Sequence, residues 1–413
     1  MMRMKKGLFF SFIMVFLTVT IISLIAIQTS LISHRREELF IENRINSMNN
    51  LYESIVRDVQ KSLEIIAIRA MAVTFTNVSS PPGNPLDEAN ETLKELILNG
   101  TLENTPMPLM ENATFLEWID KIQEVSELKG FNTIINVHTM TIRPYDSFNL
   151  EIQSYVSINI SDEQGVASLN KFTNIDTLVF IEDLPDPLYP LNTEGLGSSI
   201  VKKSPHVGNY TQLLLIGNGD NSFVYGETTY STTSFDDKIL VANSLGGVSG
   251  INNAKGIIFQ VGDSNTTPII VPYIINSSAL SLISENINVL LDGDAGKVWY
   301  IDNLIIHAEN SYYQSSSDGP SYLDRLEGEL QVQNKYSSQT NNLIGLESFI
   351  DKDKLYLWGV PTGDIFIERT NIDYIYFSGG TTVNCIKGVD SSFRIDDEHL
   401  SAYNVTDLTT SCS

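Results

Sequence analysis

The sequence is poor in cysteine, histidine and basic residues. Among 413 residues there are two cysteines and five histidines, and 26 lysines and arginines face 50 aspartates and glutamates. Two cysteines alone cannot build a structural zinc site, and none of the histidines has metal-ligand spacing. A net charge of −24 argues against nucleic-acid binding, because affinity for phosphate comes from clustered lysine and arginine. The G-x-S-x-G, P-loop and G-x-G-x-x-G motifs are also absent, so we expect no enzymatic activity and no cofactor.

The composition is that of a folded chain with one long apolar segment. Hydrophobic residues make up 42% and charged residues 18%, which excludes global disorder. A mean hydropathy of −0.02 excludes a polytopic transporter. The length indicates two or three folding units. The apolar segment, Leu8 to Ile27, carries no charge and would cross about 30 Å of hydrocarbon as a helix.

Residues 1–34 are therefore predicted to be a cytoplasmic tip and a transmembrane anchor. A cleaved signal peptide has a shorter apolar region and a small-residue exit, for which Ala26 is the only candidate. Basic residues flank both ends, and we favour the N-terminus inside the cell. No second apolar stretch of spanning length follows. We expect a single-pass protein of the cell membrane, in contact with membrane lipid, with its C-terminal bulk extracellular.

Residues 35–76 are predicted to extend this anchor as an amphipathic helix. Neither proline nor glycine occurs from Arg35 to Met71, and apolar residues recur at steps of three and four. These residues are Ile41, Ile45, Met48, Tyr52, Ile55, Val59, Leu63, Ile66 and Ala70. The apolar face either packs along the chain's own globular part or forms an intermolecular coiled coil.

Two features favour an extracellular location for the rest of the chain. Nine N-x-S/T sequons are candidate glycosylation sites, at Asn77, Asn90, Asn99, Asn112, Asn159, Asn209, Asn265, Asn276 and Asn404. A chain rich in asparagine, serine and threonine also makes several by chance. The cysteines, Cys385 and Cys412, either form a disulfide or are two buried thiols, and an exported chain favours the disulfide.

The pattern beyond the helix predicts an α+β fold in two further domains. In residues 77–190, helices are expected over Leu86–Leu98 and Thr114–Lys129, and strands over Thr133–Ile142 and Leu150–Ile160. In residues 191–413, short apolar runs separated by turn residues predict a mostly antiparallel, sandwich-like β domain with a C-terminal disulfide loop. The runs are 212–216, 223–229, 239–242, 256–261, 269–275, 287–291, 298–306, 354–358, 365–367 and 374–377.

Candidate chemistry is sparse. His34, His138, His206, His307 and His399 are isolated in the sequence and predict no metal site. The segments 218–221 and 292–294 offer oxygens suited to calcium, although turn residues explain them as well. Residues 396–398 are interpreted as a solvated acidic run.

Two further sets of residues have a functional and a structural interpretation. Glu327 and Glu347 would suit glycoside hydrolysis if paired, but only a β-rich ectodomain suggests this. The aromatic residues at 312–313 and 356–358 would suit a surface glycan ligand, although aromatic core positions are favoured.

The N-terminus resembles a known family. Lys5-Lys6-Gly7 directly before Leu8-Phe9-Phe10 looks like the processing site of type IV prepilins. In that family a peptidase cuts after the glycine, the apolar half of the helix packs in a filament core, and the amphipathic half supports a β-rich head. The resemblance implies cleavage between Gly7 and Leu8, with copies of this chain or other pilin-like subunits as partners.

The resemblance covers the first 70 and the last 30 residues. A C-terminal disulfide loop is common in bacterial members, which Cys385 and Cys412 would match. Bacterial major pilins carry Glu at the fifth mature position, where this chain has Phe12, and archaeal members are looser there. Residues 5–70, with the segment 183–193, are similar to archaeal membrane-anchored surface proteins.

These observations favour an extracellular structural or adhesive surface protein, pilin-like or associated with a pilus. One alternative is a ligand-binding or sensory ectodomain, which would need a partner subunit because six or seven residues inside the cell cannot supply an output module. A further alternative is an anchored hydrolase of envelope polymers.

Overall fold

The structure is a computed structural model of the chain. It describes residues 3–206, 210–214, 223–226, 239–242, 256–259, 289–292, 297–360, 368–379, 382–390 and 392–412. The fold is α+β, as the sequence predicts: a long N-terminal helix precedes antiparallel sheets and short helices, and no sheet within the described residues closes into a barrel. The sandwich-like packing stays a prediction.

The chain divides into two compact units that are interleaved along the sequence. Unit 1 comprises residues 1–70, 93–142 and 152–177, and unit 2 comprises residues 71–92, 143–151 and 178–413. Residues 143–151 and 178–190, expected within a domain spanning 77–190, group with the C-terminal residues in this division.

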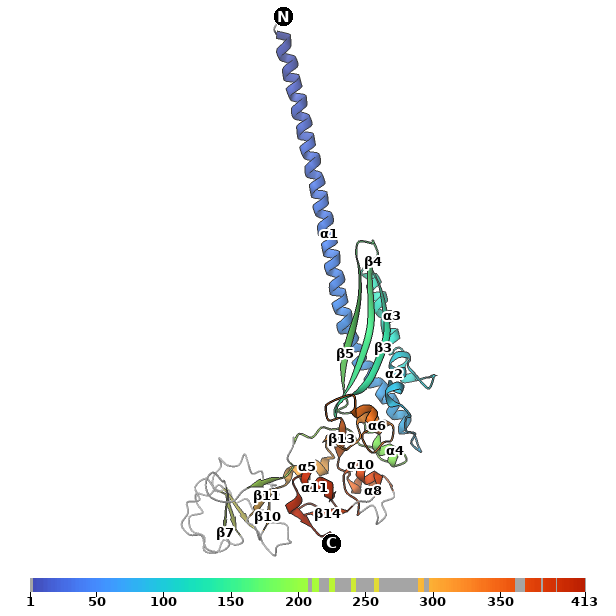
Figure 1. Cartoon of the computed structure of the whole chain (residues 1–413), viewed down its shortest axis with the longest axis vertical. Helices are drawn as coiled ribbons and strands as arrows, with labels where there is room; N and C mark the ends of the chain where they lie inside the picture. Colours follow the sequence, from blue (N-terminus) through green and yellow to red (C-terminus); the bar gives the residue numbers. More distant parts are fainter. Residues whose placement is uncertain are drawn as a thin grey trace. The chain divides into compact units, whose positions relative to one another are not determined.

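Helix α1, Arg3–Val78, is continuous for 76 residues (Figure 1). It joins the predicted anchor to the predicted amphipathic segment because no proline interrupts it, and at 1.5 Å per residue it is about 114 Å long. Its apolar face is buried within unit 1 from Met48 to Ala70. The face therefore packs along the chain's own globular part, the first of the two expected alternatives.

The lower half of α1 contacts the sheet of unit 1 through polar groups as well. The Lys171 ammonium lies 4.3 Å from the centroid of the Tyr52 ring. The Gln60 amide donates to the Asp176 carbonyl oxygen at 3.3 Å. The Arg44 guanidinium donates to the Asp162 carboxylate. These contacts hold the helix against strands β4, Asn149–Asp162, and β5, Ser168–Phe180.

Two helices follow α1 as predicted. They are α2, Ala89–Asn99, and α3, Phe115–Leu128. The capping box at the start of α3 is present: the Glu117 N–H donates to the Thr114 hydroxyl at 3.2 Å, and the Thr114 N–H donates to the Glu117 carboxylate at 3.0 Å. Short elements lie between them, namely β1, Thr101–Leu102, β2, Thr105–Pro106, and the 3₁₀ helix η1, Pro108–Met110.

A three-stranded sheet of order β3-β4-β5 follows. Its strands are β3, Phe131–Asp146, β4, Asn149–Asp162, and β5, Ser168–Phe180. The period of two predicted for β4 is confirmed, since every even position from Leu150 to Ile160 is buried. The sequence did not indicate β5, because only its last part alternates, with Ile175, Thr177 and Val179 buried.

The C-terminal residues form small sheets. The sheet β10-β11-β6 contains β6, Gln212–Leu214, β10, Val289–Asp292, and β11, Lys297–Tyr300; β10 and β11 are antiparallel, with Asp292 paired to Lys297. The strands β7, Phe223–Gly226, β8, Ile239–Ala242, and β9, Gly256–Phe259, pair in parallel. Tyr313–Ser316, β12, pairs with β13, Gly345–Ser348. Val383–Ile386, β14, lies between β15, Arg394–Asp396, and β16, Thr409–Thr410.

The prediction of strands at 354–358 and 374–377 was wrong. These segments belong to helices α8, Lys352–Leu357, and α10, Asp373–Ser378, and the run 298–306 is divided between β11 and α5, Asp302–Asn310. Aromatic residues favour strands only weakly, and in α8 local capping overrides them. The Asp351 carboxylate accepts the N–H groups of Asp353 and Lys354 and so starts α8.

Unit 2 contains an apolar core and the remaining short helices. They are α4, Leu188–Asn192, α6, Tyr322–Leu326, α7, Asn334–Ser337, α11, Asp397–Ala402, and the 3₁₀ helix η4, Thr406–Leu408. The core includes Leu304, Phe349, Ile372, Ile395 and Tyr403, which come from five separate segments of the chain. Burial of such side chains contributes about 1.5–3 kcal/mol each, so this core places the C-terminal sheet next to α10 and α11.

Candidate functional site

The first part of α1 exposes an apolar surface on all sides. Sixteen large apolar side chains between Phe9 and Ile32 are exposed, and none of the most apolar 18-residue window of the helix is buried. The hydroxyls of Thr18, Thr20 and Thr29 donate to backbone carbonyls one turn earlier, so they need no water. The helix is long and apolar enough to cross a membrane.

The two cysteines form a disulfide, as favoured by the sequence. Cys385, in β14, is bonded to Cys412, which follows β16, with the two Cα atoms 5.2 Å apart. The bond closes a loop with a sequence separation of 27. It therefore ties the C-terminal residues to the central strand of the sheet β15-β14-β16.

Loss of this bond is expected to destabilise unit 2. The double variant Cys385→Ser, Cys412→Ser should lower the free energy of unfolding by about 3 kcal/mol, because the unfolded chain regains loop entropy. Chemical denaturation of the full chain measures this. The single variant Ser401→Ala, on the exposed side of α11, is the control and should change it by less than about 0.5 kcal/mol. An unchanged midpoint in the double variant would contradict the prediction.

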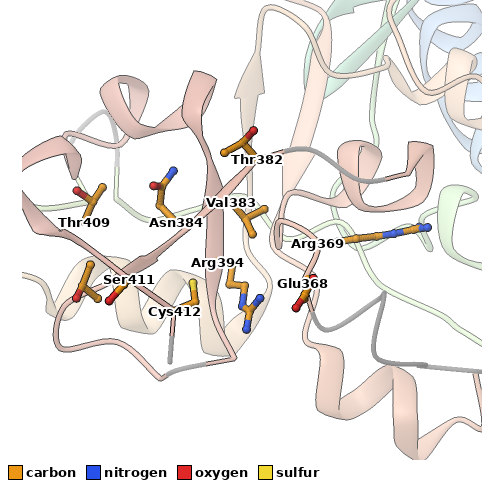
Figure 2. A pocket seen from close by; sticks show the side chains of 10 residues that line it. Glu368, Arg369, Thr382, Val383, Asn384, Arg394, Thr409, Ser411 and Cys412 are labelled. Carbon is orange, nitrogen blue, oxygen red and sulfur yellow. The ribbon is translucent and has the colours of Figure 1, made fainter.

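A pocket of about 960 Å³ lies beside the disulfide, and we call it the disulfide pocket (Figure 2). Its lining residues are Glu368, Arg369, Thr382, Val383, Asn384, Arg394, Thr409, Thr410, Ser411 and Cys412. Most of these carry a hydroxyl, amide or charged group. Figure 2 shows the Arg394 side chain between Cys412 and Glu368, whereas the Arg369 guanidinium points away from the other lining side chains.

The backbone of Arg394 is fixed from the side of Asn371. Its N–H donates to the Asn371 side-chain oxygen at 2.8 Å, and its carbonyl accepts the Asn371 N–H at 2.8 Å. The Asn371 amide in turn donates to the Ile350 carbonyl at 2.7 Å. The Nε of Arg394 is buried and has no hydrogen-bond partner among the described residues. The backbone of Arg394 is therefore held in place, whereas the Nε–H of its side chain has no hydrogen-bond acceptor among the described residues.

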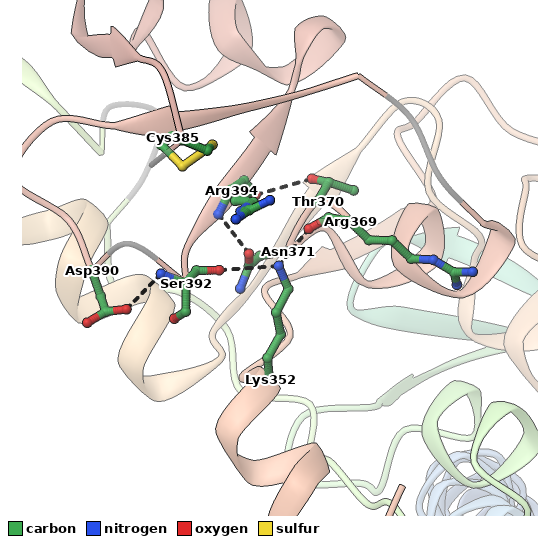
Figure 3. The surroundings of a disulfide bond; sticks show 9 residues. Lys352, Arg369, Thr370, Asn371, Cys385, Asp390, Ser392 and Arg394 are labelled. Carbon is green, nitrogen blue, oxygen red and sulfur yellow. Dashed lines mark hydrogen bonds between the residues drawn. A yellow bond between two sulfur atoms is a disulfide. The ribbon is translucent and has the colours of Figure 1, made fainter. Parts of the chain in front are cut away.

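A lysine lies behind this arginine (Figure 3). The Lys352 ammonium donates to the carbonyl oxygens of Arg369, at 2.6 Å, and Ser392, at 3.2 Å. Burial, and next the charge of Arg394, lower the pKa of Lys352 to about 7. The lowered pKa leaves Lys352 only partly charged near neutral pH, so the full positive charges at the disulfide pocket are those of Arg369 and Arg394, and Glu368 is the one acidic residue in its lining.

A second pocket, of about 760 Å³, is bordered by a buried ion network. Tyr374 and Asp396 line it, together with Asp318, Glu329 and Glu398. Behind them, His399 lies between two carboxylates: Nδ1 is 2.7 Å from Asp396 Oδ1, and Nε2 is 3.1 Å from Glu347 Oε2. Asp396, interpreted from the sequence as part of a solvated run, is instead buried, and its carboxylate caps α11.

This network holds His399 as a cation. Burial alone would lower its pKa, but the hydrogen bonds and charges of Asp396 and Glu347 raise the pKa of His399 to about 10. Burial tends to raise the pKa of Glu347, and hydrogen bonds from His399 and Tyr403 bring it below its usual value. A general base works best with a pKa near the operating pH. The geometry therefore favours a structural role for His399.

The other candidate residues are dispersed. Glu327 accepts hydrogen bonds from the Ala89 N–H, Lys335 and Tyr336, whereas Glu347 belongs to the network of His399, so the two carboxylates share no partner among the described residues. Within these residues no group of three His, Cys, Asp or Glu could hold a metal ion. The calcium candidates 218–221 and 293–294 lie outside the described residues.

The candidate aromatic surface is smaller than its sequence suggests. Tyr313 is fully buried and donates to the Asp186 carboxylate at 2.7 Å. Tyr356 and Leu357, in α8, are 70% and 80% exposed.

The sequons differ in accessibility. Asn99, Asn112, Asn159 and Asn404 are exposed, Asn77 and Asn90 are half-buried, and Asn209, Asn265 and Asn276 lie outside the described residues. Asn159 is on the exposed face of β4, as its sequence pattern indicates.

Sequence reasoning missed the most buried charged group. Arg325 is fully buried, and its Nη1 donates to Asp186 at 2.6 Å and to Asp373 at 3.0 Å. Its Nη2 donates to the Leu346 carbonyl at 2.6 Å. Burial alone would lower its pKa, but the two aspartates hold the pKa of Arg325 above its usual value. A single arginine in a short helix gives no sequence signal, because both aspartates are distant in the chain.

The chain was compared with family models, with curated proteins and with solved structures. No family model, no curated protein and no solved structure matches it.

Proposed function

We propose that the protein is a membrane-anchored extracellular structural or adhesive surface protein. One observation carries this proposal, the contrast between the two parts of α1. From Met48 to Ala70 the apolar face is buried within unit 1, whereas the residues from Phe9 to Ile32 are exposed on every side. Exposure of sixteen large apolar side chains to water is unfavourable by about 1.5–3 kcal/mol for each. A bilayer or the apolar core of a filament removes them from water.

The finer proposal is a pilin-like subunit. Lys5-Lys6-Gly7 precedes Leu8, where a prepilin peptidase would cut, and the helix continues without a break into the part that supports the head. A filament would pack the apolar parts of many copies against one another and leave each head outside. Sheets packed in a sandwich-like manner would give such a head a rigid surface. Phe12 stands where bacterial major pilins carry Glu, so archaeal pilin-like subunits are the nearer comparison.

Membrane extraction tests the anchor. The full chain should sediment with membranes after washing at alkaline pH and should require detergent for release, because residues 8–27 span the bilayer. A variant in which Phe16 and Ile22 are both changed to Lys should fail to insert, since each charge at mid-bilayer costs about 2.5–3.5 kcal/mol. The matched control places the same two lysines at Glu53 and Glu64, on the polar side of α1. Full-length protein that stays monodisperse in buffer without detergent would contradict the proposal.

Intact mass measurement separates a static anchor from a processed subunit. In native membranes a pilin-like subunit begins at Leu8, whereas a static anchor begins at Met1 or Met2. The variant Gly7→Val should retain the uncleaved N-terminus, and Ser11→Ala should not. A wild-type N-terminus that is never cleaved contradicts the pilin-like proposal and leaves the anchor in place.

A further inference from the structure

We propose that the disulfide pocket binds an acidic saccharide, with Arg394 pairing with an anionic group of the sugar and the lining hydroxyls and amide receiving its hydroxyl groups. The inference rests on the proposed surface function, for which it names a class of ligand. It is carried by the chemistry of the lining residues and by the incomplete pairing of one guanidinium.

The guanidinium of Arg394 lacks the acidic partner that Arg44, Arg143 and Arg325 have. Arg44 pairs with Asp162, and Arg143 pairs with Glu151 at 2.7 Å. For Arg394 the described residues provide no ion pair, and its Nε is buried without a hydrogen-bond partner. A half-buried charge in this condition is unfavourable. A ligand with two anionic oxygens on one group would pair with the terminal nitrogens of Arg394 and neutralise its charge, because guanidinium binds such groups in a bidentate manner.

The rest of the lining favours a ligand rich in hydroxyls. Thr382, Thr409, Thr410 and Ser411 contribute hydroxyls, Asn384 contributes an amide and Glu368 a carboxylate, and no aromatic side chain is among the described lining residues. Pockets for lipids or drug-like molecules are predominantly apolar. A neutral sugar would leave Arg394 unpaired, and a metal cation would be repelled by it. In an acidic saccharide the anionic group would pair with Arg394, and the sugar hydroxyls would bond to the neutral lining groups and donate to the Glu368 carboxylate.

The pocket is also held rigid, which reduces the ordering cost of binding. The Cys385–Cys412 disulfide fixes the segment that carries Thr410 and Ser411 to β14. Asn371 fixes the backbone of Arg394 through two hydrogen bonds of 2.8 Å. The volume of about 960 Å³ admits more than one sugar ring.

Calorimetric titration of the full chain in detergent micelles tests the inference. Trigalacturonate is the probe, and its fully methyl-esterified form is the matched ligand control, since it keeps the shape and the sugar hydroxyls but has no charge. Arg394→Gln should weaken trigalacturonate binding by about 10- to 100-fold, because a charge-assisted hydrogen-bonded pair is lost. Lys387→Gln removes a charge near the same sheet but outside the lining, and should change affinity by less than about twofold.

A second variant keeps the test valid if Arg394→Gln disturbs folding. Thr410→Val preserves the side-chain shape at an exposed position and should weaken binding by about two- to tenfold through loss of one hydroxyl. A sulfated oligosaccharide and inorganic phosphate are then added as competitors of trigalacturonate, to identify the source of the anionic oxygens. Competition by the sulfated oligosaccharide supports the inference, and competition by inorganic phosphate alone overturns it.

Three other results overturn it as well: no binding of any acidic sugar, equal binding of the esterified sugar, or unchanged affinity in both variants. Membrane extraction is measured separately on the same preparation. Protein that requires detergent but binds no acidic sugar refutes this inference alone, whereas a soluble chain that binds the sugar refutes the anchor alone.

Discussion

Arg325→Met is expected to lower the free energy of unfolding by about 3–5 kcal/mol. The change leaves the carboxylates of Asp186 and Asp373 buried without their cation. Burial already raises the pKa of Asp373 to about 6 despite the nearby guanidinium. Without Arg325 the aspartates must take up protons or unfold the surrounding segments. Methionine is similar in length to arginine, so the loss of unfolding free energy reflects the missing charge more than the missing side-chain volume.

The matched control is Arg143→Met, because Arg143 pairs with Glu151 in the same unit but remains 30% exposed. That substitution should lower stability by no more than about 1 kcal/mol. Urea denaturation of each full-length variant in detergent, followed by circular dichroism, gives both values. Equal losses in the two variants would show that burial of the Arg325 ion pairs is not what stabilises unit 2.

His399→Gln should lower the free energy of unfolding by about 3 kcal/mol near pH 6, and the loss should shrink at high pH. The folded pKa of His399 is about 10, above the ordinary value near 6.5 of an unfolded chain. Its contribution to stability is therefore complete below about pH 6.5 and disappears as pH rises toward 10. Removal of a buried ionic partner has an effect of this size.

The carboxylates of the network set the acidic limit of this contribution. Burial raises the pKa of Glu347 and Asp396, but their hydrogen bonds outweigh burial and lower it. The contribution of these carboxylates to stability is therefore present above about pH 4.5, and it is lost as the pH falls through their pKa values in the folded protein. The stability difference between wild type and His399→Gln should thus peak between about pH 4.5 and 6.5.

His138→Gln is the control, because the His138 Nε2 contacts the Ser157 hydroxyl at 2.9 Å and not a carboxylate. Denaturation series from pH 4 to 10 measure both variants against wild type. A difference for His399→Gln that is constant across this range would refute the assignment of a shared proton-linked network to Glu347, His399 and Asp396.

Local patterns predicted the elements that depend on near neighbours. The continuous α1 and the helices α2 and α3 follow from contacts within four residues in the chain, and β4 follows from burial of alternate residues on one face of its sheet. Such contacts are visible as periodicity and capping. The helices α8 and α10 were mistaken for strands because their aromatic residues are typical of strands and their lengths of six residues are too short for a clear helical period.

The buried charges had no such signal. Arg325 meets Asp186 and Asp373 across separations of 139 and 48 residues, and His399 meets Glu347 across 52. No pattern in the neighbouring sequence distinguishes any of these residues from a charged residue that is exposed to solvent. Asp396 shows this clearly, because two exposed acids follow it while it is itself buried.

The amino-acid sequence alone determined that one uninterrupted helix begins with a span of membrane length and continues with a single apolar face, since helix formation and its periodicity are local. It also supplied the two cysteines that close the C-terminal loop. Only the tertiary structure decided which charges lie in the core, and that Arg394 faces a hydroxyl-rich pocket beside the disulfide. Those relations arise when segments distant in the chain are packed together and water is removed from between them.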